Sequence, residues 1–352
     1  MESKMNHLEP SPQFYGAPFI ANEFNGMPYR LLGSSGLRVS NVGLGTWKFG
    51  FPEKGDGSRV DEKAAFKIMD RAIELGVTHW DTANRYNNSS GNSERIIGKW
   101  LHHNPDQRRN VVLATKMFGG MDGVTPNHSR LSRANILDSV YASLARMQIN
   151  TVDVLYFHRF DNITPVEESL AAVEDMISRD LVRYLAVSNF SVDQLKIYKS
   201  AMASASIRSA VVAVQNQFDI LNGESNAFPG VLDYCAESRS SFVAWSPLAR
   251  GLITDRYLKP SEAGKGDRLY DEGTIDKDAT EEKMTKVKKL DALAKGWDLS
   301  VSQLALAYML SLPGMGPVIP SSSSVEQLES NAHAGKVTLD TAQLQQVHEI
   351  IV

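Results

Sequence analysis

Short apolar runs alternate along this chain with longer segments in which apolar residues recur at helical spacing. The clearest helical pattern places Ala65, Ile68 and Ala72 on one face, and Gly76 ends it. Continuous apolar runs, such as residues 152–157, are typical of strands buried on both faces of a parallel sheet. Eight such strands alternate with predicted helices, which indicates the α/β class and a TIM (β/α)8 barrel.

An open doubly wound sheet is the alternative fold, but its usual G-x-G-x-x-G turn is missing, since Gly43-Leu44-Gly45 has no third glycine at the required spacing. Residues 28–40 predict a short N-terminal hairpin ahead of the barrel. We expect residues 1–27 to form an extension outside the fold and residues 28–352 to form the barrel.

Start signals mark several predicted helices. Ser or Thr stands three residues before Glu or Gln, as in a capping box, at Thr164, Ser191, Ser300 and Ser324. Residues 247–283, rich in Gly, Asp, Lys and Glu, lose all periodicity. An insertion of this length predicts a functional loop that overhangs the mouth of the barrel.

Composition excludes several classes of partner. Charged residues make up 22% of the chain and the net charge is −4, so no broad basic field exists for nucleic acid or an anionic membrane. The lone Cys235 excludes an intramolecular disulfide, and no apolar run is long enough for a signal peptide or a membrane span. The histidines lack ligand spacing, so no metal is predicted. We therefore expect a cytoplasmic protein with a small-molecule substrate.

Polar groups end successive predicted strands. Asp81, Lys116 and His158 each close an apolar run, and Tyr86 lies in the loop after Asp81. Because a barrel gathers its strand ends at one mouth, we expect these four side chains to meet. The ammonium of Lys116 is expected to lower the pKa of the Tyr86 phenol, while Asp81 keeps the lysine charged. Such an acid suits reduction of a carbonyl, with His158 orienting the oxygen.

Several motifs together resemble the aldo-keto reductases, in the branch of the potassium-channel β subunits and bacterial aldo/keto reductases. They are YRLLGSSGLRVSNVGLGTW, DTANRY, VDVLYFH, VSNF, VQNQFDILN, WSPLARGLIT and IPSSSSVEQLESN. The resemblance implies a catalytic tetrad of Asp81, Tyr86, Lys116 and His158, with Tyr86 as the proton donor. Asn87 and Ser321 stand where the family usually has glycine.

The resemblance also implies a bound NADP, with NAD as the alternative. Nicotinamide contacts are expected from Ser188, Asn189, Gln215 and Trp245. Pyrophosphate contacts are expected from Ser246, Leu248, Gly251 and Arg256, and adenosine contacts from Ser321, Ser323, Gln327 and Asn331. Arg256 is also the candidate for the charge that a 2′-phosphate needs. Trp245 alone is equally consistent with core packing, and Trp47 either walls the substrate pocket or shields the top of the barrel.

Three functions follow. The leading prediction is an NADP(H)-dependent reductase that acts on a small carbonyl, or on an alcohol in reverse. Polar loop residues at 84–88 favour a sugar-like substrate. The alternatives are a Schiff-base aldolase with Lys116 as nucleophile and a non-catalytic, nicotinamide-binding regulatory subunit. No pattern in the sequence indicates an oligomeric state.

Overall fold

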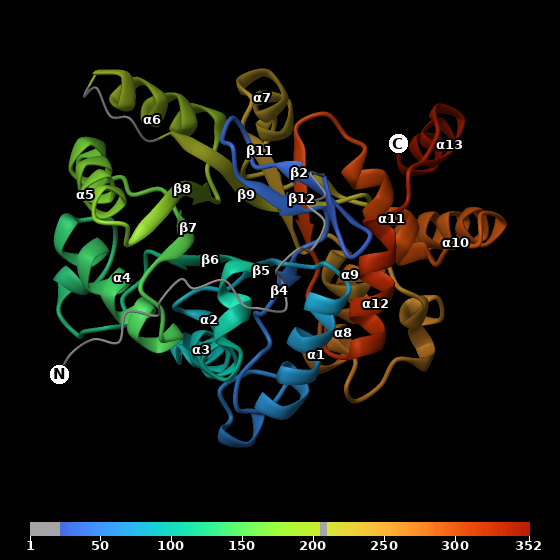
Figure 1. The fold of residues 1–352 in the computed structure, drawn as a ribbon. Helices are drawn as coiled ribbons and strands as arrows, with labels where there is room; N and C mark the ends of the chain where they lie inside the picture. Colours follow the sequence, from blue (N-terminus) through green and yellow to red (C-terminus); the bar gives the residue numbers. More distant parts are fainter. Residues whose placement is uncertain (1–21, 205–209) are drawn as a thin grey trace, which may run out of the picture.

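The predicted barrel is confirmed. The computed structural model describes residues 22–204 and 210–352, so most of the expected extension lies outside the described residues. Within them, eight parallel strands form one sheet, and bridges from Val42 to Val318 and from Gly45 to Ser321 close it into a barrel (Figure 1). In barrel order the strands are β4 (Leu44–Gly45), β5 (His79–Asp81), β6 (Val112–Met117), β7 (Val152–Phe157), β8 (Val182–Ser188), β9 (Val211–Asp219), β11 (Ser241–Trp245) and β12 (Met315–Ile319).

Helices cover the outside of the barrel. In Figure 1, α4, α5 and α6 lie on one side of the sheet, while α10, α11 and α12 lie on the other. The longer helices are α1 (Glu62–Glu74), α3 (Asn92–His103), α4 (Arg133–Met147), α5 (Val166–Ser178), α6 (Val192–Ser204), α7 (Val231–Ser238), α10 (Glu281–Gly296), α11 (Val301–Leu310), α12 (Val325–Ala334) and α13 (Thr341–Ile351). Within the two described ranges, every helix is too short or too polar to cross a membrane.

The N-terminal hairpin closes one end of the barrel. It is part of a small antiparallel sheet of β1 (Glu23–Phe24), β2 (Met27–Leu31) and β3 (Arg38–Ser40), which begins before the expected boundary at residue 28. Leu32 and Val39 are buried against the barrel interior, where Val154 and Tyr156 also lie. Because apolar side chains plug this end, the cavity opens at the other end, where the strands finish.

Most of the predicted helix starts are observed. Ser191 and Ser300 form reciprocal capping boxes, whereas Gln327 contacts Ser323 instead of completing the box with Ser324. The prediction at Thr164 was wrong, because α5 has no side-chain cap. Thr164 Oγ1 instead donates to Asp161 Oδ2 at 2.7 Å, so its hydroxyl is held at that carboxylate and not at the start of α5.

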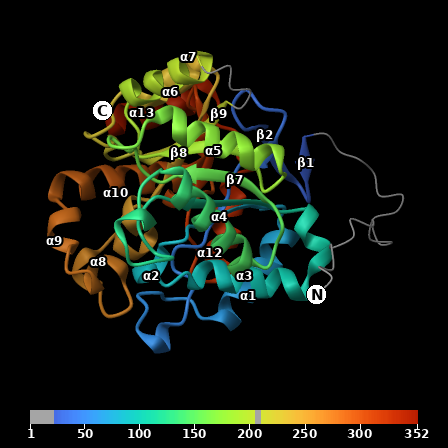
Figure 2. The same cartoon turned by 90° about the vertical axis from the view of Figure 1, so that its left-hand side faces the viewer.

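The long insertion folds into a covering segment, residues 247–279, made of short helical turns. They are η5 (Ala249–Gly251), η6 (Asp255–Tyr257), η7 (Pro260–Glu262), α8 (Arg268–Asp271) and α9 (Ile275–Asp278). Figure 2 shows α8, α9 and α10 gathered on one side of the molecule. The sequence shows no periodicity here because no single turn is long enough to repeat an apolar face.

Candidate active site

Three of the four predicted site residues are joined by direct hydrogen bonds. Lys116 Nζ lies 2.5 Å from Asp81 Oδ1 and 2.6 Å from the hydroxyl of Tyr86, which lies 3.1 Å from Asp81 Oδ1. Asp81 ends β5, Lys116 lies near the end of β6, and Tyr86 begins the short helix α2 (Tyr86–Ser89). Parallel pairing of β5 with β6 brings the strand ends to the same edge of the barrel.

Surrounding groups hold this cluster in place. Lys116 Nζ also donates to the carbonyl of Thr82 at 3.0 Å, and Gln215 Nε2 donates to Asp81 Oδ2 at 2.8 Å. Lys116 is 1% exposed and Asp81 is 3% exposed. The ammonium and the carboxylate are therefore oriented by the barrel itself and are almost completely removed from water.

The expected lowering of the Tyr86 pKa is contradicted. Burial and the adjacent carboxylate of Asp81 raise the pKa of Tyr86 well above its usual value. Burial also lowers the pKa of the Lys116 ammonium, although Asp81 opposes that shift. The prediction counted the favourable ammonium and omitted the cost of removing a phenolate from water, which is larger here.

His158 faces the same space as Tyr86. It follows β7, and its ring centroid lies 6.4 Å from that of Tyr86 in an edge-to-face arrangement. Burial, followed by the charge of Lys116, lowers the pKa of His158 to about 3. The imidazole is therefore neutral at physiological pH, and it offers a hydrogen bond instead of a positive charge.

A cavity of about 560 Å³ opens over Tyr86 and His158. Asp81 also lines it, whereas Lys116 lies behind the tyrosine. Every residue predicted to contact cofactor or substrate lines this cavity: Trp47, Ser188, Asn189, Gln215, Trp245, Ser246, Leu248, Gly251, Arg256, Ser321, Ser323, Gln327 and Asn331. The structure thus brings together residues from both halves of the chain.

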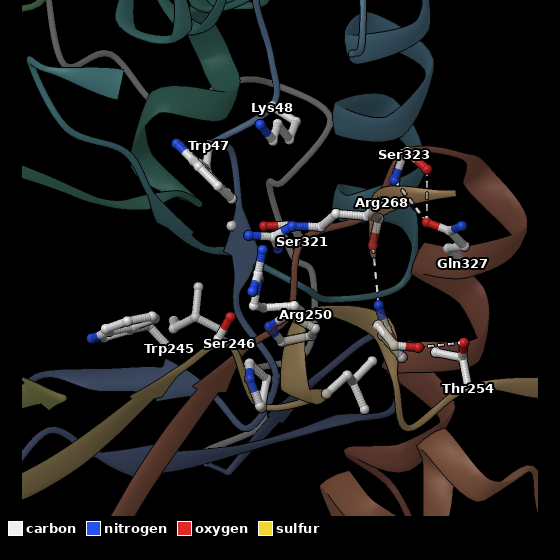
Figure 3. A pocket seen from close by; sticks show the side chains of 18 of the residues that line it. Trp47, Lys48, Trp245, Ser246, Arg250, Thr254, Arg268, Ser321, Ser323 and Gln327 are labelled. Carbon is white, nitrogen blue, oxygen red and sulfur yellow. Dashed lines mark hydrogen bonds between the residues drawn. The ribbon is translucent and has the colours of Figure 1, made fainter. Parts of the chain in front are cut away.

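Sequence reasoning missed four cations that also line the cavity: Lys48, Arg59, Arg250 and Arg268. Lys48 Nζ lies 3.9 Å from the ring centroid of Trp47, and the guanidinium of Arg268 lies 4.5 Å from it. In Figure 3, Arg250, Arg268 and Ser321 lie between Trp47, Trp245 and the Ser323–Gln327 pair. For Arg250 and Arg268, the basic residues of the covering segment were the available signal, but the direction of their side chains depends on how that segment folds back.

The cavity suits an elongated, anionic, nucleotide-like ligand. Cationic side chains line it, and Ser322, Ser323 and Ser324 precede α12, at a helix N-terminus that favours negative charge. Glycine at position 45 keeps the wall open, because a Cβ there would lie 2.9 Å from Ser321 Oγ. These features fit a dinucleotide cofactor.

The fold and the site together define an α/β-barrel protein with a polarised tyrosine at the mouth. Residues 41–352 match the model of the aldo/keto reductase family. The chain belongs to this family, which supports an oxidoreductase acting on a small carbonyl substrate, and members of the family generally use NAD(P)H.

Several curated relatives cover nearly the whole chain. An uncharacterized oxidoreductase, YrpG, from Bacillus subtilis is 33% identical, over 92% of this chain and 96% of the relative. L-glyceraldehyde 3-phosphate reductase from Escherichia coli K12 is 29% identical over 95% of both chains. A probable voltage-gated potassium channel subunit beta from rice (Oryza sativa subsp. japonica) is 31% identical, over 88% of this chain and 91% of the relative.

Proposed function

We propose that this protein is an NADP(H)-dependent reductase that converts an aldehyde or ketone to an alcohol, with Tyr86 as the proton donor. One observation carries the proposal: the Tyr86 hydroxyl faces the cavity while it lies 2.6 Å from the ammonium of Lys116. Nicotinamide, when bound, supplies the hydride. The chain's own residues then handle the proton and the carbonyl oxygen.

The electrostatics of the site support proton donation by Tyr86. Its raised pKa keeps the phenol protonated until a stronger base arrives, and an alkoxide is a stronger base than a phenolate. The ammonium of Lys116 stabilises the phenolate that remains after transfer, and Asp81 fixes that ammonium in place. The neutral imidazole of His158 donates a hydrogen bond to the carbonyl oxygen and orients it toward Tyr86.

The cofactor assignment follows the resemblance to the aldo-keto reductases, and it is supported by the fact that all the residues concerned line one cavity. Ser188, Asn189, Gln215 and Trp245 would hold the nicotinamide end beside Tyr86. Ser246, Leu248, Gly251 and Arg256 would lie along the pyrophosphate, and Ser321, Ser323, Gln327 and Asn331 would bind the adenosine end. The surplus of cations along the wall favours NADP over NAD, because NADP carries one additional phosphate. Fluorescence titration with NADPH and NADH tests this preference.

Replacing Tyr86 by Phe tests the proton donor. Tyr86→Phe should lower kcat by about 10²–10⁴-fold, the usual contribution of general acid catalysis. The Kd for NADPH should stay within about twofold, because no proposed cofactor contact is removed. Steady-state assays on a carbonyl panel and fluorescence titration measure the two quantities. Tyr184→Phe, on β8 and outside the cavity lining, is the matched control. Unchanged turnover in Tyr86→Phe would refute the role.

The substrate is proposed to be a small, polar carbonyl compound, with sugar-like aldehydes first on the panel. One relative is named as an L-glyceraldehyde 3-phosphate reductase, and the compound in that name is a small hydroxylated aldehyde. Trp47 is proposed to wall the substrate end, since it lines the cavity together with Tyr86 and His158.

A regulatory role is the second candidate, and the similarity to plant channel β subunits is the observation that favours it. Nicotinamide binding without steady turnover on the panel, together with co-purification of a larger partner, would support it.

The Schiff-base alternative is not favoured by the geometry. Lys116 Nζ already donates to Asp81, Thr82 and Tyr86, and the residue lies outside the cavity lining. Borohydride should therefore trap no adduct on Lys116.

A further inference from the structure

The backbone directly after Tyr86 takes a left-handed conformation at three successive residues. Asn87, Asn88 and Ser89 have φ values of 54°, 55° and 61°. Residues with a side chain pay roughly 1–2 kcal/mol for each such position, and asparagine tolerates it better than most. Glycine would accept this backbone at a lower cost, so something other than backbone preference must favour the asparagine side chain at position 87.

The side chain of Asn87 makes one strong contact and leaves one atom without a partner. It is buried, and its Nδ2 donates to the carbonyl of Phe49 at 2.6 Å. Among the described residues, nothing bonds to its buried Oδ1. An unsatisfied buried acceptor costs about as much as the neighbouring hydrogen bond contributes. The net gain in stability from this amide is therefore small, which points to a functional reason for the contact with Phe49.

Phe49 belongs to the segment that carries one wall of the cavity. Its N–H donates to the carbonyl of Thr46 at 3.0 Å, so the backbone turns tightly around Trp47 and Lys48. Both of these residues line the cavity. The hydrogen bond from Asn87 thus joins the residue after the proposed acid to the turn that holds the indole of Trp47.

We infer that Asn87 is a positioning residue that fixes the spacing between Tyr86 and the Trp47 wall, and thereby the size of carbonyl that fits between them. This inference rests on the proposed function. A tether of this kind holds a substrate in the reactive geometry, and a displacement of about 1 Å can cost up to ~10²-fold in rate. Small carbonyls depend most on the tether, because they make few other contacts that would hold them against Tyr86.

The test compares Asn87→Gly with wild type. Glycine accepts the left-handed backbone and removes only the amide. We expect kcat/KM for a small aldehyde such as glyceraldehyde to fall about 10–100-fold. The value for a bulky aromatic aldehyde should change less than about threefold, and the Kd for NADPH less than about twofold. The ratio between the two aldehydes is the decisive readout, because general loss of folded enzyme lowers both rates equally.

Asn25→Gly is the matched control. Asn25 is also left-handed, with φ 50°, and its Nδ2 donates to the carbonyl of Ile73 at 3.0 Å, but it lies in the turn between β1 and β2, in the N-terminal hairpin. This variant should leave both aldehyde rates unchanged. Equal rates in Asn87→Gly and wild type would overturn the inference, and so would an equal loss on both aldehydes.

Hydrogen exchange provides a readout that needs no turnover. Without the tether, amides of residues 47–58 should exchange about tenfold faster in Asn87→Gly, and those of β6 and β7 should be unchanged. Unaltered exchange over residues 47–58 would also overturn the inference. If the wild-type protein reduces no carbonyl, the proposed function fails, whereas the exchange comparison still tests the tether.

Discussion

The buried ammonium of Lys116 is explained by the chemistry of the candidate site better than by the stability of the fold. Burying an ion pair such as Lys116–Asp81 contributes little net stability, because both charges lose their hydration. Here the pair lies within hydrogen-bond distance of the Tyr86 hydroxyl, with Lys116 Nζ 2.6 Å away. A fixed positive charge beside a hydroxyl has an evident use in stabilising a phenolate, so the pair is better explained by chemistry than by folding.

His79, on the strand that ends in Asp81, gives a prediction for stability against pH. Its imidazole is fully buried, and burial lowers its pKa to about 4. In the unfolded chain the pKa of histidine is about 6.5. Between these values the unfolded chain binds more protons, so the stability that depends on neutral His79 is present above pH ~6.5 and is lost as the pH falls toward 4. The loss should approach about 1.4 kcal/mol per pH unit.

The comparison of wild type with His79→Leu isolates this effect. Urea unfolding at pH values from 6.5 to 4.5 gives the free energy of unfolding of each protein. The wild-type slope should exceed that of the variant by about 1.4 kcal/mol per pH unit at its steepest. Packing changes shift the absolute stability of His79→Leu at every pH and leave the difference in slope intact. His158 is present in both proteins, so its own contribution cancels. Parallel slopes would show that His79 titrates normally in the folded state.

At the scale of elements, the covering segment is held over the cavity by ion pairs. Arg250 donates to Asp278 at 2.8 Å and also pairs with Glu272, which ties η5 to the region of α8 and α9. Arg59, from the segment before α1, lies 3.1 Å from Asp271. Because these pairs join the segment to itself and to the barrel mouth, the cations that the segment contributes to the cavity are positioned by its fold.

Arg256, in η6 of this segment, is expected to distinguish NADPH from NADH. Its guanidinium side chain is 53% exposed and lies 2.6 Å from Asp267, so it can reach a phosphate without being desolvated. Arg256→Gln should raise the Kd for NADPH about tenfold, since a charged hydrogen bond contributes ~1.5–3 kcal/mol at most. The Kd for NADH should rise less, because NADH shares the pyrophosphate but lacks the 2′-phosphate. Fluorescence titration of both nucleotides measures the ratio.

An exposed arginine outside the cavity provides the control for that experiment. Arg109, in η3 (Pro105–Arg109), is exposed, and Arg109→Gln should leave both dissociation constants unchanged. Equal weakening of NADPH and NADH in Arg256→Gln would assign the residue to the pyrophosphate that both nucleotides share. That result would remove Arg256 as the source of NADP preference.

At the scale of the whole molecule, the sequence was sufficient to predict the fold and the position of the candidate site wherever the local pattern of residues agrees with the topology of the barrel. Apolar strands that end in Asp81, Lys116 and His158 required only that parallel strands finish at one mouth. Asp81, His158 and the residues after β11 and β12 line the cavity, with Lys116 behind Tyr86, because the same rule applies to every strand. The fold was therefore predictable from periodicity, and the location of the site followed from the fold.

Properties that depend on tertiary packing were not predictable. Whether the pKa of Tyr86 is raised or lowered depends on how completely the phenol is buried, and no local sequence pattern shows this. Arg250 and Arg268 reach the cavity only because the covering segment folds back, and the Thr164 hydroxyl donates to Asp161 instead of capping a helix. In each case the deciding partner comes from the three-dimensional arrangement and not from the spacing of residues in the motif.

Closure of the barrel gives the final prediction. The strand β4 is only two residues long, and bridges at Val42 and Gly45 join it to the β12 side. The cavity spans this seam, because Gly45, Trp47, Ser321 and Asn331 all line it. A dinucleotide bound there should hold the two ends of the chain together.

NADPH at ~100 times its Kd should add about 2.7 kcal/mol to the free energy of unfolding. Calorimetry should record a Tm higher by a few degrees, with the same increase in Tyr86→Phe. No increase with saturating NADPH or NADH would contradict a dinucleotide site in this cavity.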